Sequence, residues 1–73
     1  MATIKIEAAV TGKVWKIEKQ PGDQVAVDEA IVILESMKME IPVEATSAGT
    51  VREIKVAEGD SVTEGQVVVI IES

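Results

Sequence analysis

Residues 22–36 read GDQVAVDEAIVILES and residues 59–73 read GDSVTEGQVVVIIES, so one pattern of glycine, acids and β-branched residues occurs twice. The same register extends backwards, because residues 3–36 align with residues 40–73 without a gap and thirteen of these 34 pairs are identical. Two copies of one short unit, neither of which can bury its apolar face alone, predict two packed sheets related by a pseudo-twofold axis. We therefore expect a single domain over residues 1–73, made of these two half-motifs.

The residue types in both copies favour strands. Val and Ile together account for 21 residues and Leu for one, and β-branched side chains fit a pleated sheet better than a helix. Short apolar runs separated by turn residues predict an all-β fold, a flattened barrel or sandwich of two four-stranded antiparallel sheets (a barrel-sandwich hybrid). The eight expected strands are Ile4–Ile6, Val14–Ile17, Val25–Val27, Ile31–Leu34, Ile41–Val43, Val51–Val56, Ser61–Val62 and Val67–Ile71.

Two local features recur in both halves. Pro21-Gly22-Asp23 suits a type II turn, because proline presets φ at the second position and glycine accepts a positive φ at the third. Glu58-Gly59-Asp60 occupies the equivalent place in the second half. Val14 and Ile17 have opposite parity in a strand of period two, as do their partners 37 positions later, so we expect a β-bulge in each copy.

Charge and composition exclude several classes of function. Thirteen acidic against seven basic residues give a net charge of -6, which disfavours nucleic-acid and membrane partners. The chain has no Cys, His, Tyr or Phe, so we expect no catalytic residues and no metal site. The acids Glu35, Glu40, Glu44 and Glu72 are interpreted as a solvated face. No signal peptide or membrane span is recognisable, so we expect a cytoplasmic protein, and a monomer as an isolated domain.

Met37, Lys38 and Met39 are the residues that the repeat leaves out. Strand signals end at Glu35 and resume near Glu40, which predicts that these three residues form the connection of an exposed hairpin. Methionines beside an exposed lysine are unusual, because apolar side chains gain little from burial there. By composition alone, an ordinary surface lysine between two partly packed methionines is as good an interpretation as a functional site.

Trp15 is the sole aromatic residue, and two interpretations stay open for it. In a domain with so small a core, it is suited to covering one edge of the sandwich. Its partner in the repeat is Arg52, a residue typical of a solvent-facing strand, which keeps a docking role open.

The segment Glu35-Ser36-Met37-Lys38-Met39-Glu40 resembles the attachment motif of the biotinyl/lipoyl attachment family, in particular of biotin carboxyl carrier proteins and short stand-alone attachment proteins. The similarity extends along the chain through Gly12-Lys13-Val14, Pro21-Gly22-Asp23, Ala48-Gly49-Thr50-Val51 and residues 58–66. Two departures are the loop Ala8-Ala9-Val10-Thr11, where the family often has proline followed by methionine, and the absence of a "thumb" insertion. The resemblance implies covalent biotin on Lys38, ligase recognition of Met37 and Met39, and a motif flank of Glu35, Ser36 and Glu40.

The resemblance also implies a function. A biotin protein ligase uses ATP to form an amide with Lys38, and the domain then shuttles carboxyl groups, as carboxybiotin, between a biotin carboxylase and a carboxyltransferase. Such a domain is a carrier and not an enzyme. One alternative is a lipoyl carrier, whose pattern has aspartate before the lysine and usually alanine after it. A second is an unmodified barrel-sandwich interaction module, in which a helical hairpin usually separates the half-motifs that are only three residues apart here.

Overall fold

The computed structural model describes residues 2–73, which form eight short β-strands. The strands are β1 (Thr3–Glu7), β2 (Gly12–Ile17), β3 (Gln24–Val25), β4 (Ala30–Ser36), β5 (Met39–Glu44), β6 (Gly49–Ile54), β7 (Ser61–Val62) and β8 (Val67–Glu72). Each overlaps one of the predicted apolar runs, although β3 and β6 end two residues before Val27 and Val56, where we placed their ends. Within residues 2–73 there is no helix long and apolar enough to cross a membrane.

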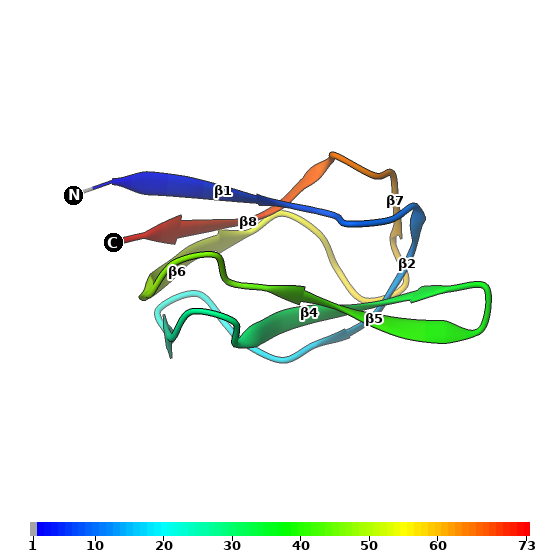
Figure 1. Cartoon of the computed structure of the whole chain (residues 1–73), viewed down its shortest axis with the longest axis horizontal. Helices are drawn as coiled ribbons and strands as arrows, with labels where there is room; N and C mark the ends of the chain where they lie inside the picture. The colour runs from blue at the N-terminus through cyan, green and yellow to red at the C-terminus, as the bar shows by residue number, and fades with distance from the viewer. Residues whose placement is uncertain (1) are drawn as a thin grey trace.

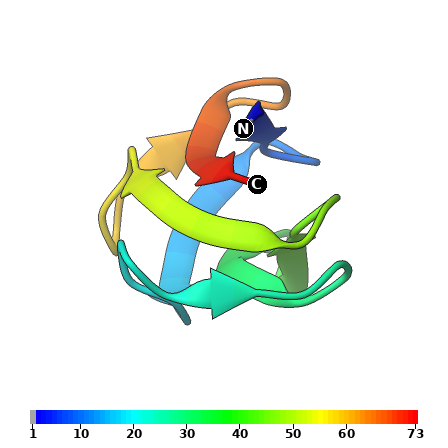
Figure 2. The same ribbon diagram turned by 90° about the vertical axis from the view of Figure 1, so that its left-hand side faces the viewer.

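Each of the two sheets takes two strands from each half of the chain (Figure 1). One sheet has the order β1-β8-β6-β3 and the other β5-β4-β2-β7, and all neighbours are antiparallel. Exchanging every strand with its equivalent in the other half converts the first order into the second, as a pseudo-twofold axis requires. Viewed from the end that carries both termini, the strands enclose a common core (Figure 2). The predicted all-β fold of two four-stranded sheets with pseudo-twofold symmetry is confirmed.

The core obeys the same symmetry. Every buried apolar side chain has a buried partner 37 positions away, so both halves contribute equally and neither can form the core alone. The seven pairs of buried apolar residues are Ile6/Val43, Ala8/Ala45, Val14/Val51, Val25/Val62, Ile31/Val68, Val32/Val69 and Leu34/Ile71. No buried side-chain nitrogen or oxygen in the described part of the chain lacks a hydrogen-bond partner.

The predicted bulges and turns are present in both copies. The register of β2 against β4 shifts between Val14 and Lys16, and the register of β6 against β8 shifts at the equivalent place. Gly22 has a φ of 97°, and the N–H of Asp23 donates to the carbonyl of Gln20 across 3.0 Å, as in a type II turn. The turn at Gly59, with a φ of 93°, repeats this arrangement.

The β4–β5 hairpin and the chain termini lie at opposite ends of the molecule, which measures 36 × 18 × 18 Å (Figure 1). At the terminal end, the N–H of Ser73 donates to the carbonyl of Ala2 across 3.0 Å. Ser73 and Ala2 are the repeat equivalents of Ser36 and Met39, which pair at the tip of the hairpin. The tip of the hairpin and the paired termini are therefore related by the pseudo-twofold axis.

Candidate functional site

Met37 and Lys38 form the tip of the β4–β5 hairpin. Ser36 pairs with Met39 across the two strands, so the loop has two residues and not the three that we expected. Met39 belongs to β5, because it continues the ladder. The φ values of Met37 and Lys38 are 52° and 64°, and a positive φ at both central residues is the pattern of a type I′ turn. The sequence hid this turn, since type I′ turns favour Asn-Gly and not Met-Lys.

All three residues between the half-motifs face solvent. The side chains of Met37 and Met39 are 92% and 63% exposed, and Lys38 is exposed as well. The amine of Lys38 makes no ion pair with any residue in the range 2–73. The predicted exposure of the hairpin connection is confirmed, and the interpretation in which the methionines are partly packed is wrong for Met37.

The acidic flank of the turn lies on the outer face of its sheet. Glu35 and Glu40 are directly opposite each other on β4 and β5, and Lys13 of β2 is opposite Glu35 on the other side. Like charges that face each other across strands repel, and the lysine on the far side of Glu35 offsets part of that repulsion. Both acids are close in sequence to Lys38.

The base of the hairpin is attached to the rest of the domain through Thr11. The hydroxyl of Ser36 donates to the carbonyl of Thr11 across 3.0 Å, and the hydroxyl of Thr11 accepts from the N–H of Glu64 across 3.0 Å. Gly12 follows, and a Cβ at this position would collide with the carbonyl oxygen of Glu35. The first loop and the β7–β8 turn therefore hold the strand that leads to Lys38. The sequence signal for this contact is the recurrence of Gly12 as Gly49 in the second half-motif.

The remaining acids form no site. Within residues 2–73 there is no group of three or more acidic side chains placed to hold a metal ion. Glu72 is half-buried and lies 3.6 Å from the exposed Arg52, Oε2 to Nε, and Glu44 is an exposed residue of β5. Glu35, Glu40 and Glu44 are solvated as we interpreted them, and Glu72 is only partly so.

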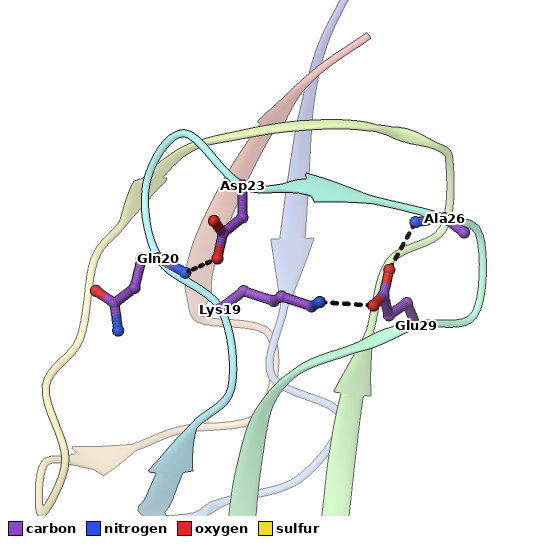
Figure 3. A network of polar contacts seen from close by, with 5 residues as sticks. All are labelled: Lys19, Gln20, Asp23, Ala26 and Glu29. Carbon is purple, nitrogen blue, oxygen red and sulfur yellow. Dashed lines mark hydrogen bonds and ion pairs between the residues drawn. The ribbon is translucent and has the colours of Figure 1, made fainter.

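The densest polar network lies at the other end of the molecule (Figure 3). Lys19 Nζ is 2.7 Å from a carboxylate oxygen of Glu29, whose other oxygen accepts from the N–H of Ala26 across 2.9 Å. The hydrogen bond from Lys19, and then the one from Ala26, lower the pKa of Glu29, and the hydrogen bond to Glu29 raises the pKa of Lys19. Asp23 accepts from the N–H of Gln20 across 2.8 Å. This network stabilises the loops around β3 and has no part in the Lys38 turn.

Trp15 lies on the same sheet as the hairpin. It is the extra residue of the β2 bulge, between Val14 and Lys16, and its side chain is 49% exposed. Half of the indole is thus accessible, so covering the sandwich does not account for all of its surface.

The chain resembles known proteins over most of its length. The family model described as "Biotin-requiring enzyme" matches residues 2–71. A Bacillus subtilis (strain 168) protein named "Biotin/lipoyl attachment protein" is 48% identical over 40 residues, which are 55% of this chain and 52% of that protein. A protein of Emericella nidulans named as a urea carboxylase is 50% identical over 36 residues, which are 49% of this chain and 3% of that protein. The matches thus span about half of one relative and a small part of the other.

Solved structures of carboxylases contain domains with the same fold as this chain. The crystal structure of the Kluyveromyces lactis urea carboxylase matches 99% of this chain, and 6% of that chain, with a TM-score of 0.93 and 33% identity. A single-chain, multi-domain long-chain acyl-CoA carboxylase shares the fold, with a TM-score of 0.86 and 24% identity over 93% of this chain and 7% of that chain. Because the family model covers nearly every residue, the chain belongs to the biotin/lipoyl attachment family, whose domains carry biotin or lipoate covalently.

Proposed function

We propose that this chain is a biotin carrier domain and that the acceptor of biotin is the Nζ atom of Lys38. The observation that carries the proposal is the type I′ turn, in which Met37 and Lys38 occupy the two positive-φ positions at the exposed tip of a hairpin. A positive φ is costly for residues with a Cβ, and Asn-Gly would form the turn more favourably. Backbone strain of this kind persists at functional sites, where the side chain is needed for another purpose.

The surroundings of Lys38 fit a covalently attached group. Attachment requires an accessible amine and free space around it, and both flanking methionines project into solvent. The hydrogen bond between Ser36 and Thr11 fixes the base of the hairpin, so the turn has a defined position on the domain. The lysine is therefore presented on a rigid element, which suits an enzyme that has to align one amine with an activated carboxyl group.

In the proposed reaction this chain is a substrate first and a carrier afterwards. A biotin protein ligase transfers AMP from ATP to the carboxyl group of biotin and releases pyrophosphate. Lys38 Nζ, after loss of a proton, then attacks the carboxyl carbon and displaces AMP to form an amide. A protonated amine has no free electron pair for the attack, so we assign the removal of the proton to a base of the ligase. Biotin, when bound, supplies a ring that carries a carboxyl group from a biotin carboxylase to a carboxyltransferase.

Biotin is preferred over lipoate because of the residues beside the lysine. Met37 and Met39 occupy the places where the lipoyl pattern has aspartate and alanine, and two of the matched proteins are named as urea carboxylases. Lipoate is the second candidate, because the Bacillus subtilis relative is named for either group. The double variant Met37→Asp/Met39→Ala should favour lipoylation over biotinylation if these side chains determine ligase choice. Equal biotinylation rates for parent and variant would place the choice elsewhere in the domain.

The test of the function is the intact mass of the chain after co-expression with a biotin protein ligase, combined with a streptavidin blot. The parent should gain one biotinyl group, and Lys38→Arg should gain none while its circular dichroism stays unchanged. Exchanging Lys38 with Met37, or with Met39, keeps composition and charge, and should slow labelling strongly because the amine leaves its place in the turn. A biotinylated Lys38→Arg variant would refute the assignment of Lys38.

A further inference from the structure

The outer faces of the two sheets provide an internal comparison, because the pseudo-twofold axis relates them position by position. On the sheet that contains β8, Glu53, Ile70 and Lys5 lie opposite one another on three neighbouring strands. Arg52, on the bulge of β6, is exposed and lies 3.6 Å from Glu72 (Nε to Oε2). Charged side chains thus surround the one apolar residue of this row, which is the pattern of a face that stays in water.

The equivalent face of the other sheet has an apolar character. Lys16, Ile33 and Pro42 lie opposite one another on β2, β4 and β5, and Trp15 occupies the bulge position that Arg52 has on the first sheet. The indole is 49% exposed and Pro42 is exposed. We refer to the surface of Trp15, Lys16, Ile33 and Pro42 as the tryptophan face. The bulge position therefore carries a charged residue, Arg52, on one sheet and an exposed aromatic residue, Trp15, on the other.

The charges beside Trp15 indicate the chemistry of a partner. Lys13 makes no ion pair with any residue in the range 2–73, although Glu35 lies opposite it on β4, and Lys16 Nζ is 3.8 Å from Glu18 Oε1 in an exposed pair, which contributes little. Lys13 and Lys16 are the charged residues of β2 on either side of Trp15 along the strand. A complementary surface would offer an apolar pocket for the indole with carboxylates beside it.

The position of the tryptophan face identifies which partner this is. The strands β4 and β5 that contribute Ile33 and Pro42 also carry the Lys38 turn, and Lys38 is five positions after Ile33, about 17 Å of extended chain. A standard protein interface covers about 800 Å² on each partner and is about 30 Å across, so one protein can contact both. A ligase must bring the amine of Lys38 into its own active site, whereas the enzymes that follow need only reach the end of the attached arm.

We propose that the tryptophan face is the docking surface for the biotin protein ligase, with Trp15 as its anchor. The inference rests on the proposed function, because it assumes that Lys38 is the acceptor. Aromatic anchors of this kind contribute a large share of interface energy. Removing the anchor weakens the complex and leaves the turn itself unchanged.

The experiment transplants residues between the two faces. Trp15→Arg/Lys16→Glu gives the tryptophan face the residues of Arg52 and Glu53, and Arg52→Trp/Glu53→Lys is the matched control on the other sheet. In steady-state biotinylation with a biotin protein ligase, ATP and biotin, this chain is the substrate whose concentration is varied. The KM for the first variant should be at least tenfold above that for the parent chain, with kcat within twofold of the parent value. The control should keep both constants within twofold of the parent. Urea unfolding of both variants separates a loss of docking from a loss of fold.

A second readout observes the contact directly. Because Trp15 is the only tryptophan, 5-fluorotryptophan gives a single ¹⁹F resonance, which should shift or broaden when unlabelled ligase is added to the Lys38→Arg variant. An unchanged KM for Trp15→Arg/Lys16→Glu, or a resonance that responds to a biotin carboxylase but not to the ligase, would overturn the docking proposal. A parent chain that acquires no biotin at all would instead overturn the proposed function, so the two failures are distinguishable.

Discussion

Replacing Met37-Lys38 by Asn-Gly should make the domain more stable, although it removes the acceptor amine. Both residues have a positive φ, which costs a residue with a Cβ about 1–2 kcal/mol, and Met37 is 92% exposed, so little burial is lost. The added glycine lowers the free energy of unfolding by about 0.5–1 kcal/mol, because it makes the unfolded chain more flexible. The net gain in free energy of unfolding for Met37→Asn/Lys38→Gly is therefore about 1–2 kcal/mol, or roughly 5–15 °C in Tm for a domain of this size.

The assay is urea unfolding followed by the fluorescence of Trp15, with thermal unfolding by circular dichroism. Positions 28 and 65 supply an internal control, because they are repeat equivalents with φ values of 69° and 88° but carry Asp and Gly respectively. Gly65→Asp should lower the free energy of unfolding, since a Cβ is then placed at a positive φ, and Asp28→Gly should change it little. If the Asn-Gly variant proved no more stable than the parent while Gly65→Asp behaved as expected, the turn would not be strained and the argument for Lys38 from backbone cost would fail.

Three further outcomes follow from contacts described above. Because the pKa of Glu29 is lowered in the folded chain, its ion pair stabilises the fold above the ordinary carboxyl pKa, and this stability is lost as pH falls through the folded pKa of Glu29. Because the pKa of Lys19 is raised, its contribution is lost as pH rises through the folded pKa of Lys19. Lys19→Val/Glu29→Gln should therefore flatten the pH dependence of urea unfolding at both the acidic and the alkaline end. Gly12→Ala should lower the Tm, because the new Cβ collides with the backbone of β4, and a cost below about 0.5 kcal/mol would show that the strands move apart freely. Ser36→Ala should cost about 1 kcal/mol and slow biotinylation, since the hairpin base loses its hydrogen bond to Thr11; an unchanged rate would show that the turn is rigid without it.

The sequence was sufficient for the elements and the symmetry, because both depend on which residues face the core. The repeat and the alternation of apolar residues identified all eight strands, and the parity of Val14 and Ile17 located the bulge in β2. The sequence did not show that each sheet takes two strands from each half of the chain. Periodicity determines which side of a strand is buried, but pairing depends on contacts between distant segments that leave no local signal.

The hairpin was located correctly but given the wrong length, for a related reason. Propensity assigns Met37, Lys38 and Met39 alike to the connection, because none is β-branched or aromatic. Only the pairing of Ser36 with Met39 reduces the loop to two residues. The candidate site was therefore predicted from its motif, whereas the positive φ values of its turn are known only from the structure. A departure from the favoured turn residues in an exposed hairpin is the pattern expected where function overrides local preference.

The pseudo-twofold axis allows turn and docking face to be tested apart. Ser73 and Ala2 are paired as Ser36 and Met39 are, so a circular permutant that begins at Met39, joins Ser73 to Ala2 through an added Met-Lys and ends at Ser36 should form the same turn at the opposite end. The permutant should fold, because its strands and core are unchanged, but its lysine adjoins the charged outer face instead of the tryptophan face. If docking requires an aromatic anchor on the adjoining face, the permutant should be biotinylated at least tenfold more slowly than the parent at low substrate concentration. Adding Arg52→Trp/Glu53→Lys should then restore the rate, and full-rate labelling of the unmodified permutant would mean that the ligase reads the turn alone.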